Sequence, residues 1–177
     1  MISKKVLFIA LILMIGTCHF VHAQEPDLSD LMDFEIQAIG KSDKLKTVKL
    51  SKLIGKQKVI VIDLWATWCG PCRQSIPELV SLQTEYKDKG VEIIGLSIET
   101  PDRLKPVLEM RSSFKINYQL GFTTPELYSA MDNRRVVPQT FIFGRDGVLI
   151  KHIRGWSQTL VPKVMRESIE IALNQKQ

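Results

Sequence analysis

The chain has 177 residues, a formal net charge of +5, and a composition that is 45% hydrophobic and 24% charged. This length suits one domain with a hydrophobic core. The densest basic stretch, residues 41–52, alternates with apolar residues as a solvated strand face does, and this argues against a nucleic-acid surface, which would need a broader basic stripe.

The N-terminus has the pattern of a secretory signal peptide. A basic start is followed by ten unbroken apolar residues, Val6–Ile15, and by the small-residue sequence VHA that ends at Ala23. The apolar run is short for a transmembrane helix, which needs roughly 20 residues. An uncleaved anchor and lipidation at Cys18 remain alternatives. We therefore predict a signal peptide over residues 1–23, one domain over 24–177, and a location in the periplasm or on the extracytoplasmic face of the envelope.

Strand-like and helix-like patterns alternate along the first half of the domain. FEIQAIG and TVKLSKLIG alternate as strands do, and the apolar run KVIVIDLW (Lys58–Trp65) is typical of a central buried strand. A helix is expected over Gly70–Lys89, bent at Pro77 because proline removes one backbone hydrogen bond. A second buried strand is expected over Val91–Glu99.

The second half continues this alternation and ends in a hairpin. A helix should start near Thr100, a short strand is expected near Asn117–Leu120, and TTPELYSAM opens another helix. QTFIF and VLIKHI, joined by GRDG, form a β-hairpin, and a last helix runs from about Ser157 to Leu173. Strands alternating with helices predict a three-layer α/β/α sandwich with a mixed central sheet.

Cys69 and Cys72 are the only cysteines left once the signal peptide is removed. A structural zinc site needs four ligands, and this pair with the one remaining histidine, His152, cannot supply them. We expect His152 to be a strand-face residue, and a copper-carrying role has equally little support. A passive staple is unfavourable because closing so short a loop removes little chain entropy. A redox couple fits best, and no metal or cofactor is expected.

The position of the pair also favours redox chemistry. Cys69 falls at the N-terminus of the expected helix, where unpaired amides and the positive end of the helix dipole lower the pKa of a thiol. Cys72 lies one turn further in and is more sheltered. Cys69 would attack a substrate disulfide as a thiolate, and Cys72 would then resolve the mixed disulfide.

WATWCGPC (Trp65–Cys72) resembles the active site of thioredoxin-like proteins. VKLSKLIGKQKVIVIDLWATWCGPCR, IPEL and VVPQTFIFGRDGVLIKHIRG are similar to the extracytoplasmic TlpA/ResA-like branch, over roughly residues 34–173. The resemblance implies a thioredoxin-like fold with an N-terminal strand extension and a helix-strand insertion at about Pro101–Leu120. It also implies a thiol–disulfide oxidoreductase that reduces disulfides of envelope proteins, for example in cytochrome c maturation, with electrons from a membrane thiol carrier.

The resemblance assigns roles to single residues. Cys69 would be the exposed nucleophile and Cys72 the resolving thiol. Pro138 would be a cis-proline facing the disulfide, and Val137 would offer backbone groups to an extended substrate. The other candidate substrate contacts are Trp68, Gly70 and Pro71.

The proton that Cys72 must lose needs an acceptor. Many members of the branch carry a glutamate three residues after the second cysteine, where this chain has Ser75. Asp63 instead lies six residues before Cys69, where thioredoxin has its buried acid, and a desolvated carboxyl should have a raised pKa. We therefore expect Asp63 to take the proton, and not Glu78, which follows a proline on an expected exposed turn.

Two other classes of function remain open. A peroxidase of the peroxiredoxin kind shares the fold, although its usual P-x-x-x-[ST]-x-x-C setting is absent from this chain. The other is a non-catalytic module that binds thiols or copper.

Overall fold

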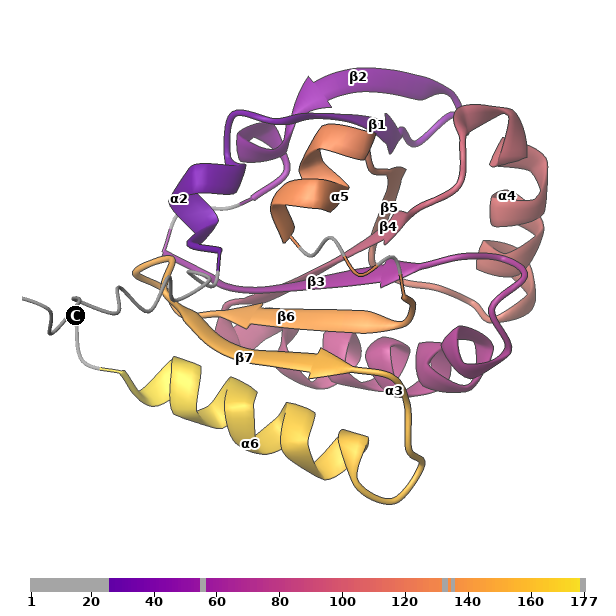
Figure 1. Cartoon of the computed structure of the whole chain (residues 1–177). Helices are drawn as coiled ribbons and strands as arrows, with labels where there is room; N and C mark the ends of the chain where they lie inside the picture. Colours follow the sequence, from indigo (N-terminus) through magenta and orange to yellow (C-terminus); the bar gives the residue numbers. More distant parts are fainter. Residues whose placement is uncertain (1–25, 55–56, 132–133, 135, 176–177) are drawn as a thin grey trace, which may run out of the picture.

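The computed structural model of the chain describes residues 26–54, 57–131, 134 and 136–175, and it contains a seven-stranded mixed sheet (Figure 1). The predicted signal peptide lies outside the described residues. Within the described part, no helix is both long and apolar enough to cross a membrane.

The strands are β1 (Glu35–Ile39), β2 (Leu45–Lys49), β3 (Val59–Trp65), β4 (Val91–Ser97), β5 (Gln119–Phe122), β6 (Gln139–Phe143) and β7 (Leu149–Arg154). The helices are α2 (Leu28–Leu31), α3 (Gly70–Tyr86), α4 (Leu104–Ser113), α5 (Pro125–Met131) and α6 (Val161–Asn174). Short 3-10 turns occupy Leu50–Lys52, Lys87–Lys89 and Pro101–Arg103.

The strand order in the sheet is β2-β1-β5-β4-β3-β6-β7. β3, β4 and β5 run parallel, whereas β6 is antiparallel to β3 and β7 is antiparallel to β6. β1 and β2 form an antiparallel pair, and β1 lies beside β5. This pair is the expected N-terminal extension. The carboxyl ends of the three parallel strands therefore share one edge of the sheet, and the C-G-P-C loop follows β3 at that edge.

Alternate residues of β3 face two separate hydrophobic cores. Val61 and Trp65 pack with α3, α4 and α6, while Ile62 and Leu64 pack with α2 and α5. Figure 1 shows α5 and α3 on opposite sides of the sheet. Every residue of β3 is buried, as the apolar sequence predicts for a central strand. The predicted three-layer sandwich is thus confirmed.

Several element boundaries differ from the prediction: α3 ends at Tyr86 and not at Lys89, and β4 ends at Ser97 and not at Glu99. α6 begins at Val161 and not near Ser157, because the preceding residues form a turn and Pro162 occupies the first helical turn, where proline is favoured. β5 begins at Gln119, since its pairing with β4 starts there and continues to Phe122. α3 continues through Pro77.

Candidate active site

The loop between β3 and α3 carries both cysteines. A turn follows Trp65, in which the Cys69 N–H donates to the carbonyl of Ala66 at 3.1 Å, and α3 begins at Gly70. Cys69 is the N-cap residue of α3, and its Sγ accepts the N–H of Cys72 at 3.1 Å. The two Sγ atoms form a disulfide, with the Cα atoms 5.2 Å apart. Once this bond is reduced, the first amides of α3 and its dipole favour a thiolate on Cys69.

Solvent exposure falls steeply along this loop. Trp68 is 66% exposed, whereas Cys69 is 4% and Cys72 0% exposed. Cys69 is therefore much less exposed than the resemblance implied, because its sulfur is bonded to Cys72 and both residues pack into the core cluster that includes Ile76. Cys69 is still the more exposed of the two cysteines, and Trp68 stands beside it as an apolar surface.

Asp63 lies on the side of β3 that faces α3. Its side chain is on the same face of β3 as those of Val61 and Trp65, which belong to the same core cluster as both cysteines. The residue is 1% exposed, which confirms that the acid is buried. Burial raises the pKa of Asp63 from 3.8 to about 7, and a hydrogen bond from Thr140 Oγ1 at 3.0 Å lowers it in part. A carboxyl with this pKa can both accept and release a proton near neutral pH.

The two alternative positions for an acid differ from Asp63. Ser75 is buried, and its hydroxyl donates to the carbonyl of Cys72 at 2.9 Å. The expectation that Glu78 lies on an exposed turn is wrong, because the helix continues past the preceding proline. Glu78 is half-buried on α3 and forms an ion pair with Arg166 of α6 at 3.0 Å.

The cis-proline segment (Val136–Pro138) leads into β6 beside the carboxyl end of β3, from which this loop starts. The Val137–Pro138 peptide bond is cis, as the resemblance implies. Pro138 immediately precedes β6, whose first residue pairs with Leu64 near the carboxyl end of β3. Val137 packs against the core cluster that contains both cysteines. Its neighbour Val136 is one of the few exposed large apolar residues, so the segment and Trp68 both present apolar surface.

A contact that the sequence analysis missed holds the loop before the cysteines. The Glu99 carboxylate accepts the N–H of Thr67 at 2.7 Å and its hydroxyl at 2.8 Å. Ser97 Oγ also donates to Glu99, at 3.1 Å. The available signal was an acid at the end of an apolar, strand-like run, two residues after β4 and at the edge of the sheet where the C-G-P-C loop begins. Glu99 thereby fixes the backbone two residues before Cys69.

His152 lies on β7 as a strand-face residue, as expected. Its ring stacks on Phe141 with centroids 3.9 Å apart, and its Nε2 lies 2.7 Å from Gln139 Oε1. Gln139 directly follows Pro138, and the sequence analysis did not single it out. An amide residue after the proline of this segment was the only signal.

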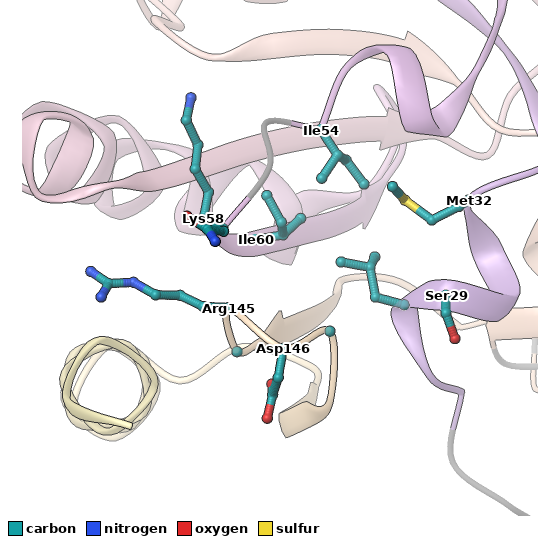
Figure 2. Close-up of a pocket in the computed structure, with 11 residues that line it drawn as sticks. Ser29, Met32, Ile54, Lys58, Ile60, Arg145 and Asp146 are labelled. Carbon is teal, nitrogen blue, oxygen red and sulfur yellow. The ribbon is translucent and has the colours of Figure 1, made fainter. Parts of the chain in front are cut away.

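Two cavities lie at opposite edges of the sheet. One cavity, of about 520 Å³, is bordered by Glu99 and Tyr128 and lies at the edge of the sheet that also carries the cysteine loop. The other, about 200 Å³, lies at the amino end of β3, and Figure 2 shows Met32, Ile54 and Ile60 gathered around it. It is far along β3 from the disulfide. No group of three or more His, Cys, Asp or Glu side chains suited to a metal ion occurs among the residues that the structure describes.

Known proteins match most of the chain. The AhpC/TSA family model matches residues 28–152. Thiol-disulfide oxidoreductase ResA of Oceanobacillus iheyensis is 42% identical over 93 residues, which are 52% of this chain and 44% of that protein. The chain spans about half the length of the curated relatives it matches.

Two solved structures extend the comparison to the fold. A Chlorobium tepidum protein, provisionally assigned as thiol:disulfide interchange protein DsbE, has a TM-score of 0.66 at 25% identity, over 85% of this chain and 99% of that one. Peroxiredoxin Q of Xanthomonas campestris has a TM-score of 0.66 at 13% identity, over 85% and 98%. At that identity the second likeness concerns the fold alone.

Proposed function

Because the chain belongs to the AhpC/TSA family and has a thioredoxin-like fold, we propose that it is a thiol–disulfide oxidoreductase that reduces disulfides of other proteins. The observation that carries the proposal is the Cys69–Cys72 disulfide at the N-terminus of α3, with a buried acid, Asp63, on the same side of β3. The names of the ResA and DsbE relatives support it.

The reaction starts from the reduced protein and transfers two electrons. The Cys69 thiolate attacks one sulfur of the substrate disulfide, the substrate S–S bond breaks, and a first substrate thiolate leaves. Cys72 then attacks Cys69 Sγ, which breaks the mixed disulfide and releases the second substrate thiolate. The protein ends as the Cys69–Cys72 disulfide, and each released thiolate takes up a proton.

Asp63 serves the second half of this reaction. Cys72 must lose its proton before it can attack, and it is fully buried, so water is a poor acceptor. The ionised Asp63 takes this proton, and with a pKa of about 7 it can release it again at neutral pH.

Substrate binding would use the surface around Cys69. Trp68 offers apolar contact, and the backbone of Val137 pairs with an extended segment of the substrate. Pro138, which directly precedes β6 near the carboxyl end of β3, would face the disulfide. Gly70 and Pro71 add little side-chain bulk, so a polypeptide can approach the sulfur closely.

The cellular setting is also a proposal. The N-terminal pattern of residues 1–23 supports action outside the cytoplasm, either as a secreted protein or with an N-terminal anchor. A reductant there must be resupplied with electrons, and a membrane thiol–disulfide carrier would do so. Disulfides of envelope proteins, including the haem-binding cysteines of apocytochrome c, are the proposed substrates.

Insulin reduction tests the activity. The purified protein with dithiothreitol should precipitate insulin B chain, whereas Cys69→Ser should be inactive. Cys72→Ser should accumulate a mixed disulfide with the substrate, visible on non-reducing gels and usable to capture partners from an envelope extract. Equilibration with glutathione should give a potential near that of thioredoxin, about −270 mV. A potential at or above the glutathione poise would contradict a reducing role.

The shared fold with peroxiredoxin Q keeps a thiol peroxidase as the rival. The same preparation, given hydrogen peroxide and dithiothreitol, distinguishes the two. A peroxidase would consume peroxide even as Cys72→Ser, because its attacking cysteine needs no partner for the first step. A metal-binding module would instead retain copper through purification and leave insulin intact.

A further inference from the structure

A chain of hydrogen bonds links β7 to the cis-proline segment, Val136–Pro138. His152 Nε2 lies 2.7 Å from Gln139 Oε1, and Gln139 Nε2 donates to the carbonyl of Val136 at 2.8 Å. On the other side, the N–H of Gly155 donates to the carbonyl of Pro138 at 2.8 Å. The carbonyls on both sides of Val137 are thus held by groups that lie within or beyond the β6–β7 hairpin.

The donor and the acceptor of each of these hydrogen bonds follow from the atoms involved. A backbone carbonyl can only accept, so the amide nitrogen of Gln139 must face Val136. The amide oxygen of Gln139 therefore faces His152, and Nε2 of His152 must carry the proton. A side chain without a donor at this point of β7 leaves a buried amide oxygen without its partner.

Packing holds this chain of hydrogen bonds in place. Gln139 is fully buried, and His152 pairs directly with Phe141 in the β6–β7 ladder, where their rings stack. The position of the His152 imidazole is therefore fixed both by the strand register and by stacking on Phe141. This leaves Gln139 little freedom to turn away from Val136.

We propose that Gln139 and His152 are positioning residues that hold the cis-proline segment in the geometry that receives a polypeptide substrate. The inference rests on the proposed function, since it concerns how the same active site binds its substrate. Neither residue touches the reacting sulfur atoms. Their loss should therefore weaken substrate binding and leave the chemistry of Cys69 and Cys72 as it is.

His152→Phe tests the proposal, because a phenyl ring can still stack on Phe141 but cannot donate to Gln139. We expect KM for insulin to rise about five- to tenfold, as for the loss of one buried hydrogen bond, with kcat within twofold of wild type. The rate with the small disulfide DTNB and the redox potential should not change. His152→Gln, whose amide nitrogen can occupy the place of Nε2, should restore KM.

Lys151→Gln is the matched control, since Lys151 is exposed and its side chain points to the other face of β7. It should behave as wild type in every assay. Gln139→Leu removes both hydrogen bonds and should raise KM at least as much as His152→Phe. Circular dichroism and Tm of each variant show whether it is folded.

Failure of the inference and failure of the proposed function look different. A wild-type protein that reduces neither insulin nor DTNB would overturn the proposed function. If wild type is active and His152→Phe has an unchanged KM, the inference is wrong. An equal loss toward insulin and DTNB, or unfolding of His152→Phe, would give His152 a merely structural role and also overturn it.

Discussion

Thr140 Oγ1 donates a hydrogen bond to Asp63 Oδ1 at 3.0 Å, across the antiparallel pair β3–β6 in which the two residues are direct partners. The bond favours the ionised carboxylate, while burial disfavours it more strongly, and the result is a pKa of about 7 for Asp63. The proposed proton acceptor is therefore tuned by a residue two positions after the cis-proline.

Asp63→Asn should slow resolution of the mixed disulfide. Only the ionised carboxylate can accept a proton, so the wild-type rate should rise with pH through about 7. The variant should lack this rise and resolve about 100-fold more slowly at pH 7.5. Stopped-flow absorbance of the second thiolate released from DTNB measures the step.

Glu78→Gln provides the control for this experiment, because Glu78 is a half-buried acid on α3 that pairs with Arg166. Its pH profile should match that of wild type. An Asp63→Asn protein that keeps the wild-type rise near pH 7 would remove Asp63 from the mechanism.

Thr140→Val should move the same pH profile upward. The change removes the hydroxyl that favours ionised Asp63 and keeps the side-chain volume similar, so the pKa of Asp63 rises further. We expect the midpoint of the rate profile to increase by about 1, as for loss of one hydrogen bond to a charged group. Thr84→Val, at an exposed site on α3, should leave it in place. An unchanged midpoint in Thr140→Val would mean that the bond does not act on the carboxyl.

Asp63 should also make stability depend on pH. Its pKa in the folded protein, about 7, is above its ordinary value of 3.8, so the folded state binds more protons between these values. The stabilising contribution of Asp63 is therefore fully present below about pH 3.8 and is lost as the pH rises through 7. The loss is on the order of 4 kcal/mol. Asp63→Asn has no such titration, so the free energy of unfolding of the wild type should decrease relative to that of the variant between pH 4 and 7. Urea denaturation over this pH range measures the difference, and a difference that does not change with pH would contradict the prediction.

Gly95→Ala should destabilise the fold beside Asp63. Gly95 is the β4 partner of Asp63, and an added Cβ would lie 2.8 Å from Leu120 Cδ2 and 3.0 Å from Tyr118 Cε2. Such overpacking costs about 1–3 kcal/mol, measurable by urea denaturation of the oxidised protein. Gly70→Ala is the comparison, because its Cβ would meet nothing within 4 Å. Equal stability of the two variants would contradict the prediction, because it would mean that the side chains of Leu120 and Tyr118 move aside at no cost.

Much of the fold and the site could be predicted because the signals are local. The apolar run of β3 and the Pro-containing helix start after Cys69 are contiguous in the sequence, so they indicated a central strand, a helix and a redox pair between them. The burial of Asp63 followed from its apolar neighbours. The exposure of Cys69 could not be predicted, since it depends on how the bonded sulfur packs against residues of the core cluster.

The sequence by itself determined the α/β architecture, the cysteine pair and the acid within the buried strand. Only the tertiary structure decided what these groups touch. Thr140 reaches Asp63 over a separation of 77 residues, and Glu99 reaches Thr67 over 32. The contact between His152 and Gln139 depends on the β6–β7 register, which contains an irregularity at Ile142 and Phe143. Such partners depend on which strands become neighbours in the sheet, and residues far apart in the sequence carry no local signal of that order.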